Sequence, residues 1–109
     1  MKNKTRSLYI DDIRPCPPGY KLAWSYETAI ECIIINGCPD HISFDHDLGT
    51  DKTGYDIAKY IVEYDLDHPG FIPDGFTFNV HSANPVGRAN IEGLLNNYLS
   101  KKVNDVCLL

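Results

Sequence analysis

Three short polar clusters in this sequence contain residue types that could do chemistry together: Asp11-Asp12, Asp45-His46-Asp47 and His81-Ser82-Ala83-Asn84. Carboxylate oxygens bind divalent cations such as magnesium. An imidazole with a pKa of about 6.5 exchanges protons at neutral pH. Taken singly, an aspartate after a strand is as often a loop residue that faces water, and a lone histidine is more often structural. The coincidence of three clusters favours the functional interpretation.

Arg88 follows Asn84 by one helical turn, at the start of a predicted helix. A helix N-terminus presents unpaired N–H groups and partial positive charge, which suits an anion such as phosphate. Gly87 would let a phosphate approach the backbone, and Arg88 would add a forked cationic donor. The alternative is an Arg88–Glu92 pair across one helical turn, which contributes only a few tenths of a kcal/mol. The crowding of Ser82 and Asn84 at the same end favours the anion role.

A phosphate beside Asp11, Asp12, Asp45 and Asp47 would be repelled unless positive charge balances the carboxylates. Magnesium, or another divalent cation with oxygen ligands, could lie among these aspartates, with Asp47 the weaker candidate as a ligand. Protonated His46 and His81 could supply the charge instead. The residues alone leave both solutions open.

The apolar pattern predicts strands and helices that alternate along the chain. Strands are expected at 7–10, 20–24, 41–44 and 76–80, and helices after Ser25, around 57–64 and from Pro85 onward. One stripe, Tyr26, Ala29, Ile30, Ile33 and Ile34, should form the buried face of the first helix. A last short edge strand is expected at Val103 to Leu109. This order predicts a three-layer α/β domain, with a parallel sheet, helices on both faces, and a Pro-rich loop in place of the first crossover helix.

In an open parallel sheet the ligand site lies beyond the carboxyl ends of the strands. Each of the three polar clusters follows a predicted strand. The topology therefore predicts that they meet at one rim, where the local sequence alone would leave them in separate loops.

Length and charge exclude several classes of protein. The 109 residues fit one domain, 1–109. A net charge of -5 without a basic stripe argues against binding long nucleic acid, but leaves room for a small phosphorylated nucleotide or an RNA end. Four cysteines show no zinc spacing, and neither a signal peptide nor a membrane span is indicated. These features lead us to expect a cytoplasmic protein, and they do not predict its oligomeric state.

The acidic pair after the first strand, the Asp after the third and Ser82 resemble the receiver domains of two-component signalling, which have a flavodoxin-like fold. The lysine that follows a fifth receiver strand is absent. The chain is more similar to the cyclic-phosphate processing receiver domain family. Four segments carry this resemblance: Leu8 to Pro15, Ser43 to Gly49, Thr53 to Asp56, and the long motif His81 to Asn90.

This resemblance implies a phosphoesterase acting on cyclic phosphates, such as 2′,3′-cyclic ends of RNA or related nucleotides, and a bacterial or phage origin. In this first hypothesis His46 and His81 share acid and base work, together with Asp45. Ser82, Asn84 and Arg88 bind the substrate, while Asp11, Asp12 and Asp45 hold a cation. Two alternatives are a non-catalytic module that binds a phosphorylated nucleotide or a partner protein, and ordinary receiver chemistry with Asp45 as phosphoacceptor. The missing lysine and the added histidines count against the last.

Overall fold

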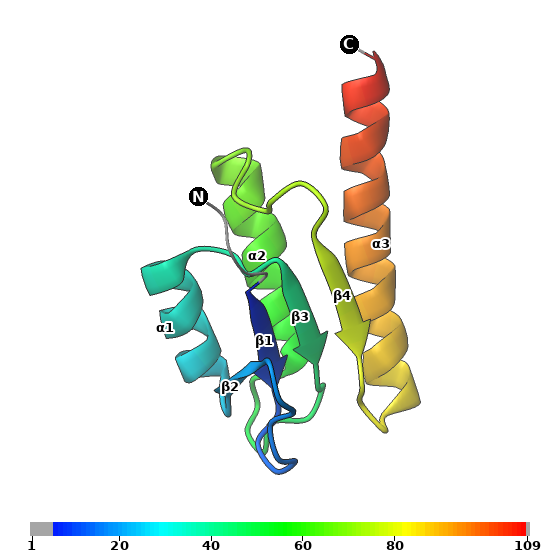
Figure 1. The fold of residues 1–109 in the computed structure, drawn as a ribbon. Coiled ribbons are helices and arrows are strands. Elements are labelled where there is room, and N and C mark those ends of the chain that lie inside the picture. Colours follow the sequence, from blue (N-terminus) through cyan, green and yellow to red (C-terminus); the bar gives the residue numbers. More distant parts are fainter. Residues whose placement is uncertain (1–5, 109) are drawn as a thin grey trace.

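The computed structural model describes residues 6–108, and their side chains as far as Lys102. Its elements are β1 (Ser7–Ile10), β2 (Lys21–Ala23), α1 (Tyr26–Asn36), β3 (His41–Phe44), α2 (Gly54–Asp67), β4 (Thr77–Val80) and α3 (Pro85–Leu108). The strands form one parallel sheet in the order β2-β1-β3-β4 (Figure 1). The predicted α/β class and receiver-like parallel sheet are confirmed.

Local sequence signals fix where the first two helices begin. Ser25 caps α1 by accepting a hydrogen bond from the Thr28 N–H, and the Thr28 hydroxyl accepts one from the Ser25 N–H. At the start of α2, the Asp56 carboxylate accepts hydrogen bonds from the N–H and the hydroxyl of Thr53. Such caps satisfy donors that the first helical turn leaves unpaired. Both caps lie at the end of the sheet where the strands finish, so they also fix the loops of that rim.

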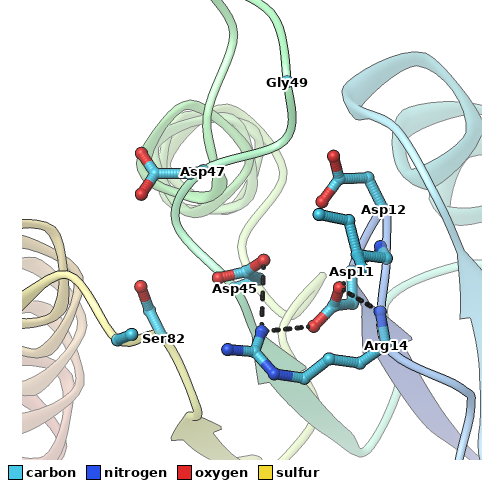
Figure 2. A pocket seen from close by; sticks show the side chains of 9 residues that line it. Asp11, Asp12, Arg14, Asp45, Asp47, Gly49 and Ser82 are labelled. Atoms are coloured by element: carbon cyan, nitrogen blue, oxygen red, sulfur yellow. Dashed lines mark hydrogen bonds and ion pairs between the residues drawn. The ribbon is translucent and has the colours of Figure 1, made fainter.

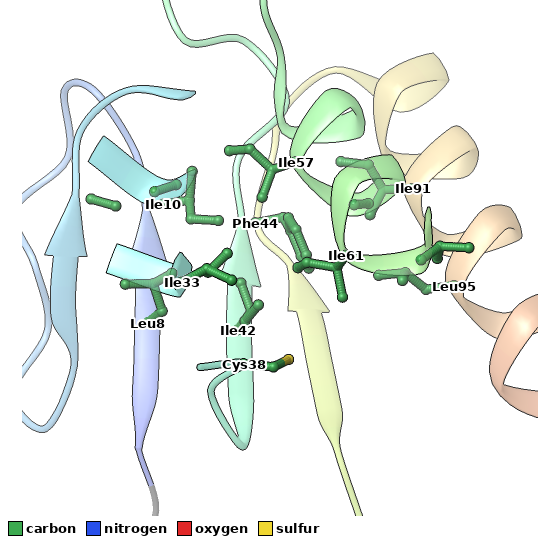
Figure 3. Close-up of a cluster of buried hydrophobic side chains, with 14 of the residues drawn as sticks. Leu8, Ile10, Ile33, Cys38, Ile42, Phe44, Ile57, Ile61, Ile91 and Leu95 are labelled. Carbon is green, nitrogen blue, oxygen red and sulfur yellow. The ribbon is translucent and has the colours of Figure 1, made fainter. Parts of the chain in front are cut away.

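The hydrophobic core lies between one face of the sheet and all three helices (Figure 3). Alternate strand residues face it, including Leu8 and Ile10 of β1 and Ile42 and Phe44 of β3. Each helix contributes side chains to this single cluster: Ala29 and Ile33 from α1, Ile57 and Ile61 from α2, and Ile91 and Leu95 from α3. The three helices therefore pack on the same face of the sheet.

The other face of the sheet differs from the expected three layers. It carries the intervening residues Tyr9, Ser43 and Asn79, and within residues 6–108 no helix covers it. Figure 1 looks onto this helix-free face, with α2 behind the strands. The connections from β2 to β3 and from β3 to β4 cross the sheet in the same direction, so right-handed crossovers place their helices on the same face. The connection from β1 to β2 crosses in the opposite direction, so a right-handed crossover there would lie on the other face. That connection is the Pro-rich loop, so the layer it would have supplied is missing.

Two further expectations were wrong. Instead of the strand predicted at Val103 to Leu109, α3 continues through Leu108, because no glycine or proline follows Gly93 to stop it; Leu109 lies outside the described residues. Lys102 and Tyr98 of this helix both bind the buried carboxylate of Asp65 in α2, at 2.8 and 2.5 Å. Ile34, expected in the core, is 65% exposed, because α1 buries only a narrow stripe.

Among the described residues, no helix combines the length and apolar character needed to span a bilayer.

Candidate functional site

The three polar clusters come together at the C-terminal ends of β1, β3 and β4, as the topology predicted. Their loops lie at the arrowhead end of the sheet in Figure 1. They enclose a surface cavity of about 420 Å³. Figure 2 shows the residues that line this cavity: Asp11, Asp12, Ile13, Arg14, Asp45, Asp47, Gly49, Ser82 and Ala83.

Asp11 is the most deeply buried carboxylate of the site, with a side chain that is 0% exposed. One oxygen, Oδ1, accepts the N–H groups of Ile13 and Arg14, both at 2.8 Å. The other, Oδ2, accepts from Arg14 Nη1 at 2.8 Å and from His81 Nε2 at 2.9 Å. Burial by itself raises the pKa of Asp11, but these four donors outweigh it and lower the pKa to about 2. Asp11 is therefore ionised at neutral pH and organises its neighbours.

Asp45 is buried at the end of β3 but has fewer partners. Its Oδ1 accepts the N–H of His46 at 2.8 Å, and its Oδ2 lies 3.6 Å from Arg14 Nη1. Burial first, and then the negative charge of Asp11, raise the pKa of Asp45. Gly54 fixes the backbone here, since a side chain on it would collide with the Asp45 carbonyl. A carboxyl with a raised pKa in a cavity can exchange protons more readily than its strongly paired neighbour Asp11.

Arg14 is a site residue that the analysis of the clusters missed. Its guanidinium lies between the carboxylates of Asp11 and Asp45, as the dashed contacts in Figure 2 show. The side chain is 44% exposed, so the guanidinium is a cation that the cavity presents to a ligand. Within the sequence, the signal was its place three residues after Asp11, inside the segment Leu8 to Pro15.

His81 is held by a partner at each ring nitrogen. Nε2 bonds Asp11, while Nδ1 lies 2.7 Å from Ser43 Oγ, and the ring stacks on Tyr9 with centroids 4.4 Å apart. A carboxylate can only accept, so Nε2 carries a proton that it donates to Asp11. With this geometry His81 orients Asp11. To act as an acid or a base, it would have to replace its hydrogen bond to Asp11 or to Ser43 with one to the substrate.

His46 packs against the first turn of α3. Its Nδ1 lies 3.0 Å from Asp47 Oδ1, and this hydrogen bond lowers the pKa of Asp47. The ring occupies the space where a Cβ on Gly87 would lie, only 2.2 Å from His46 Cγ. Gly87 therefore admits the histidine ring, where the sequence had predicted a close phosphate.

The remaining predicted ligand-binding residues have structural partners. Asn84 caps α3 by accepting the Gly87 N–H at 3.0 Å, and Ser82 Oγ accepts the Asn84 N–H at the same distance. Ser82 lines the cavity. Arg88 is 52% exposed and lies 3.4 Å from Glu92, which is the alternative that the sequence left open. Arg88 is not among the residues that line the cavity.

A possible cation site is formed by Asp11, Asp45 and His81, whose ligand atoms all lie within 4.8 Å of one another. Asp12 lines the same cavity but stands outside this set, and its side chain extends away from Asp11 in Figure 2. Two carboxylates and an imidazole are a donor set that divalent cations accept. The residues fit such an ion, with Arg14 occupying part of the space between the two carboxylates.

Comparison with known proteins gives one family. The model of the cyclic-phosphate processing receiver domain matches residues 6–97. Among solved structures, the chain is similar to one described as yeast Spc42 trimeric coiled-coil amino acids 181–211 fused to another structure. The identity is 17% and the TM-score 0.52, over 97% of this chain and 87% of that one, so this likeness shows the fold alone. No curated protein matches the chain.

Proposed function

Because the chain belongs to the cyclic-phosphate processing receiver domain family, we propose that it is a phosphoesterase that opens a cyclic phosphate on a nucleotide or at an RNA end. The observation that carries this proposal is the juxtaposition of Asp11, Asp45 and His81 within 4.8 Å, beside the exposed cation Arg14. The reaction would take place in the cavity at the C-terminal ends of the strands.

Substrate binding depends on charge, because a cyclic phosphodiester is an anion and the cavity is lined by Asp11, Asp12, Asp45 and Asp47. The Arg14 guanidinium would redirect some of its N–H groups from the carboxylates to the phosphate oxygens. Guanidinium groups favour such paired hydrogen bonds to phosphate. A divalent cation such as Mg²⁺, held by the carboxylates of Asp11 and Asp45, would polarise a phosphoryl oxygen and offset the remaining negative charge. The hydroxyl of Ser82, which lines the cavity, could donate a hydrogen bond to the same phosphate.

Proton transfer would use residues of the loop after β3. Asp45, through the carboxylate oxygen that the cation leaves free, takes a proton from water as the water oxygen bonds to phosphorus and one ring P–O bond breaks. His46 is not among the residues that line the cavity; from its place against Gly87 it would donate a proton to the departing sugar oxygen at the cavity edge. The product is a phosphate monoester. Positioned acid and base groups of this kind contribute about 10²–10⁴-fold in rate. His81 acts as a positioning residue that orients Asp11.

One observation favours a second candidate, a non-catalytic module that binds a phosphorylated nucleotide. Both ring nitrogens of His81 are engaged, and Arg14 is paired with Asp11. Such a saturated network can recognise a ligand without transferring a proton. The two candidates differ in turnover, which only the phosphoesterase shows.

Phosphorus NMR of the pure protein with nucleoside 2′,3′-cyclic phosphates and cyclic-phosphate-ended oligonucleotides, with Mg²⁺ or Mn²⁺ added, tests the proposal. We expect the cyclic resonance to be replaced by a monoester resonance. Asp45→Asn should slow this conversion about 10²-fold or more, since the amide cannot accept the proton. Asp67→Asn, at the exposed end of α2, is the matched control and should convert at the normal rate. A wild-type protein that binds these ligands and converts none of them would leave the binding module as the function.

A further inference from the structure

An exposed tryptophan directly follows β2, the strand that pairs with β1; it is not itself among the residues that line the cavity. Trp24 is 58% exposed and is the one tryptophan in the chain. A large aromatic side chain in water is a surface from which a ligand can exclude solvent. Ile13, which lines the cavity itself, is 85% exposed. An exposed apolar side chain, Ile13, therefore belongs to a cavity whose other lining residues are mainly charged.

Strand pairing places Trp24 next to Asp11. In the register of β1 and β2, Ile10 pairs with Ala23, and the Asp11 N–H donates to the Ala23 carbonyl at 3.1 Å. Trp24 is the residue that follows. Ala23 is buried in the core, so by the alternation of a strand Trp24 leaves toward the helix-free side. Tyr9 of β1, which carries the stacked His81 ring, lies on that same side.

The neighbouring aromatic at this rim is already engaged. Lys52 lies over the Tyr26 ring at 5.1 Å from its centroid. Within the described part of the chain, neither an aromatic ring nor a cation lies over Trp24 in this way. With 58% of its surface exposed, the ring can offer a face to a planar ligand group.

We propose that Trp24 stacks on the nucleobase of the substrate, which makes the substrate class a base-bearing nucleotide or RNA end. This inference rests on the proposed function for its kinetic readout. Stacking of a base on an aromatic side chain tolerates any base, because every base has a π face. A chain with a net charge of -5 gains little from long-range attraction to nucleic acid. A stacking contact supplies affinity that does not depend on charge.

Kinetics with two substrates test this role. Adenosine 2′,3′-cyclic phosphate carries a base, whereas glycerol 1,2-cyclic phosphate has none. Trp24→Ala should raise KM for the adenosine compound roughly tenfold, within the range for loss of one stacked base, and leave the glycerol compound unchanged. Trp24→Phe should retain most of the affinity. Ile35→Ala, which alters another exposed apolar residue, in the last turn of α1, is the matched control. Equal effects of Trp24→Ala on both substrates, or none, would overturn the inference.

Fluorescence separates this inference from the catalytic proposal. Since the chain has a single tryptophan, its emission reports on Trp24 alone. Adenosine 2′,3′-cyclic phosphate should quench it and glycerol 1,2-cyclic phosphate should not. Quenching without turnover would support the stacking contact while refuting the phosphoesterase. Turnover of the adenosine compound without quenching would refute the stacking contact while supporting the phosphoesterase.

Discussion

Replacing Gly87 by alanine should displace the His46 ring from its place against α3. The new Cβ would lie 2.2 Å from Cγ, 2.5 Å from Cδ2 and 2.6 Å from Nδ1 of that ring. Cγ is attached directly to the histidine Cβ, so the ring can move away only by changing its χ1 rotamer or by shifting the backbone. Either movement disrupts the 3.0 Å contact between His46 and Asp47.

The magnitude follows from two opposing effects. Overpacking of a well-packed site costs about 1–3 kcal/mol. Replacing a helical glycine by alanine gains about 1 kcal/mol. Gly93 isolates the second effect, because it lies in the same helix and nothing stands within 4 Å of its Cβ position. Gly93→Ala should therefore stabilise the protein by about 1 kcal/mol. Gly87→Ala should be less stable than Gly93→Ala by about 1–3 kcal/mol.

Urea denaturation with linear extrapolation measures the free energy of unfolding of both variants. The NMR resonances of the His46 ring report whether it has moved. If His46 donates the proton to the leaving oxygen, Gly87→Ala should also slow turnover, whereas Gly93→Ala should not. Equal stabilisation by the two substitutions, with unchanged His46 resonances, would refute the packing argument.

Two further outcomes are expected. Because the folded-state pKa of Asp11 is lowered from 3.8 to about 2, its contribution is fully present above pH 4 or so and is lost as the pH falls toward about 2. This contribution is about 2 kcal/mol of unfolding free energy. In acid denaturation, Asp11→Asn should therefore lose less stability than the wild type between about pH 4 and pH 2. Plots of unfolding free energy against pH that run parallel for the two proteins would contradict this. Mg²⁺ or Mn²⁺ should raise the melting temperature of the wild type by binding the folded state. Asp45→Asn should abolish that shift, whereas Asp12→Asn should retain most of it; a shift that survives in Asp45→Asn would place the cation elsewhere.

The convergence of the three polar clusters could be predicted from the sequence because it depends only on the order of strands and helices, and not on side-chain positions. Parallel strands all end at the same side of a sheet, so residues such as Asp11, Asp45 and His81 meet there once the order of elements is right. The cap at Ser25 was equally local, since it depends on one side chain and the first turn of a helix. These features could be derived without coordinates.

Other features depend on the path of the chain between elements. Arg14 reaches the carboxylates because Asp11 accepts the N–H groups of Ile13 and Arg14, which turns the loop back on itself. An aspartate three residues before an arginine does not by itself predict that turn. The partners of His81 depend on the register of β1, β3 and β4, which places Tyr9 and Ser43 against it. The exposure of Ile34 and the end of α3 likewise follow from tertiary packing.

The sheet order described above leaves β2 and β4 at its two edges, with backbone groups available for pairing with another chain. Such edges are templates for aggregation unless they are short, charged or covered. At one edge, β2 has three residues, begins at the exposed Lys21 and follows Pro17-Pro18 closely. At the other, α3 packs along β4. The Pro-rich loop that replaces a helix thus also limits edge-to-edge association of a sheet that, within the described residues, has helices on one face only.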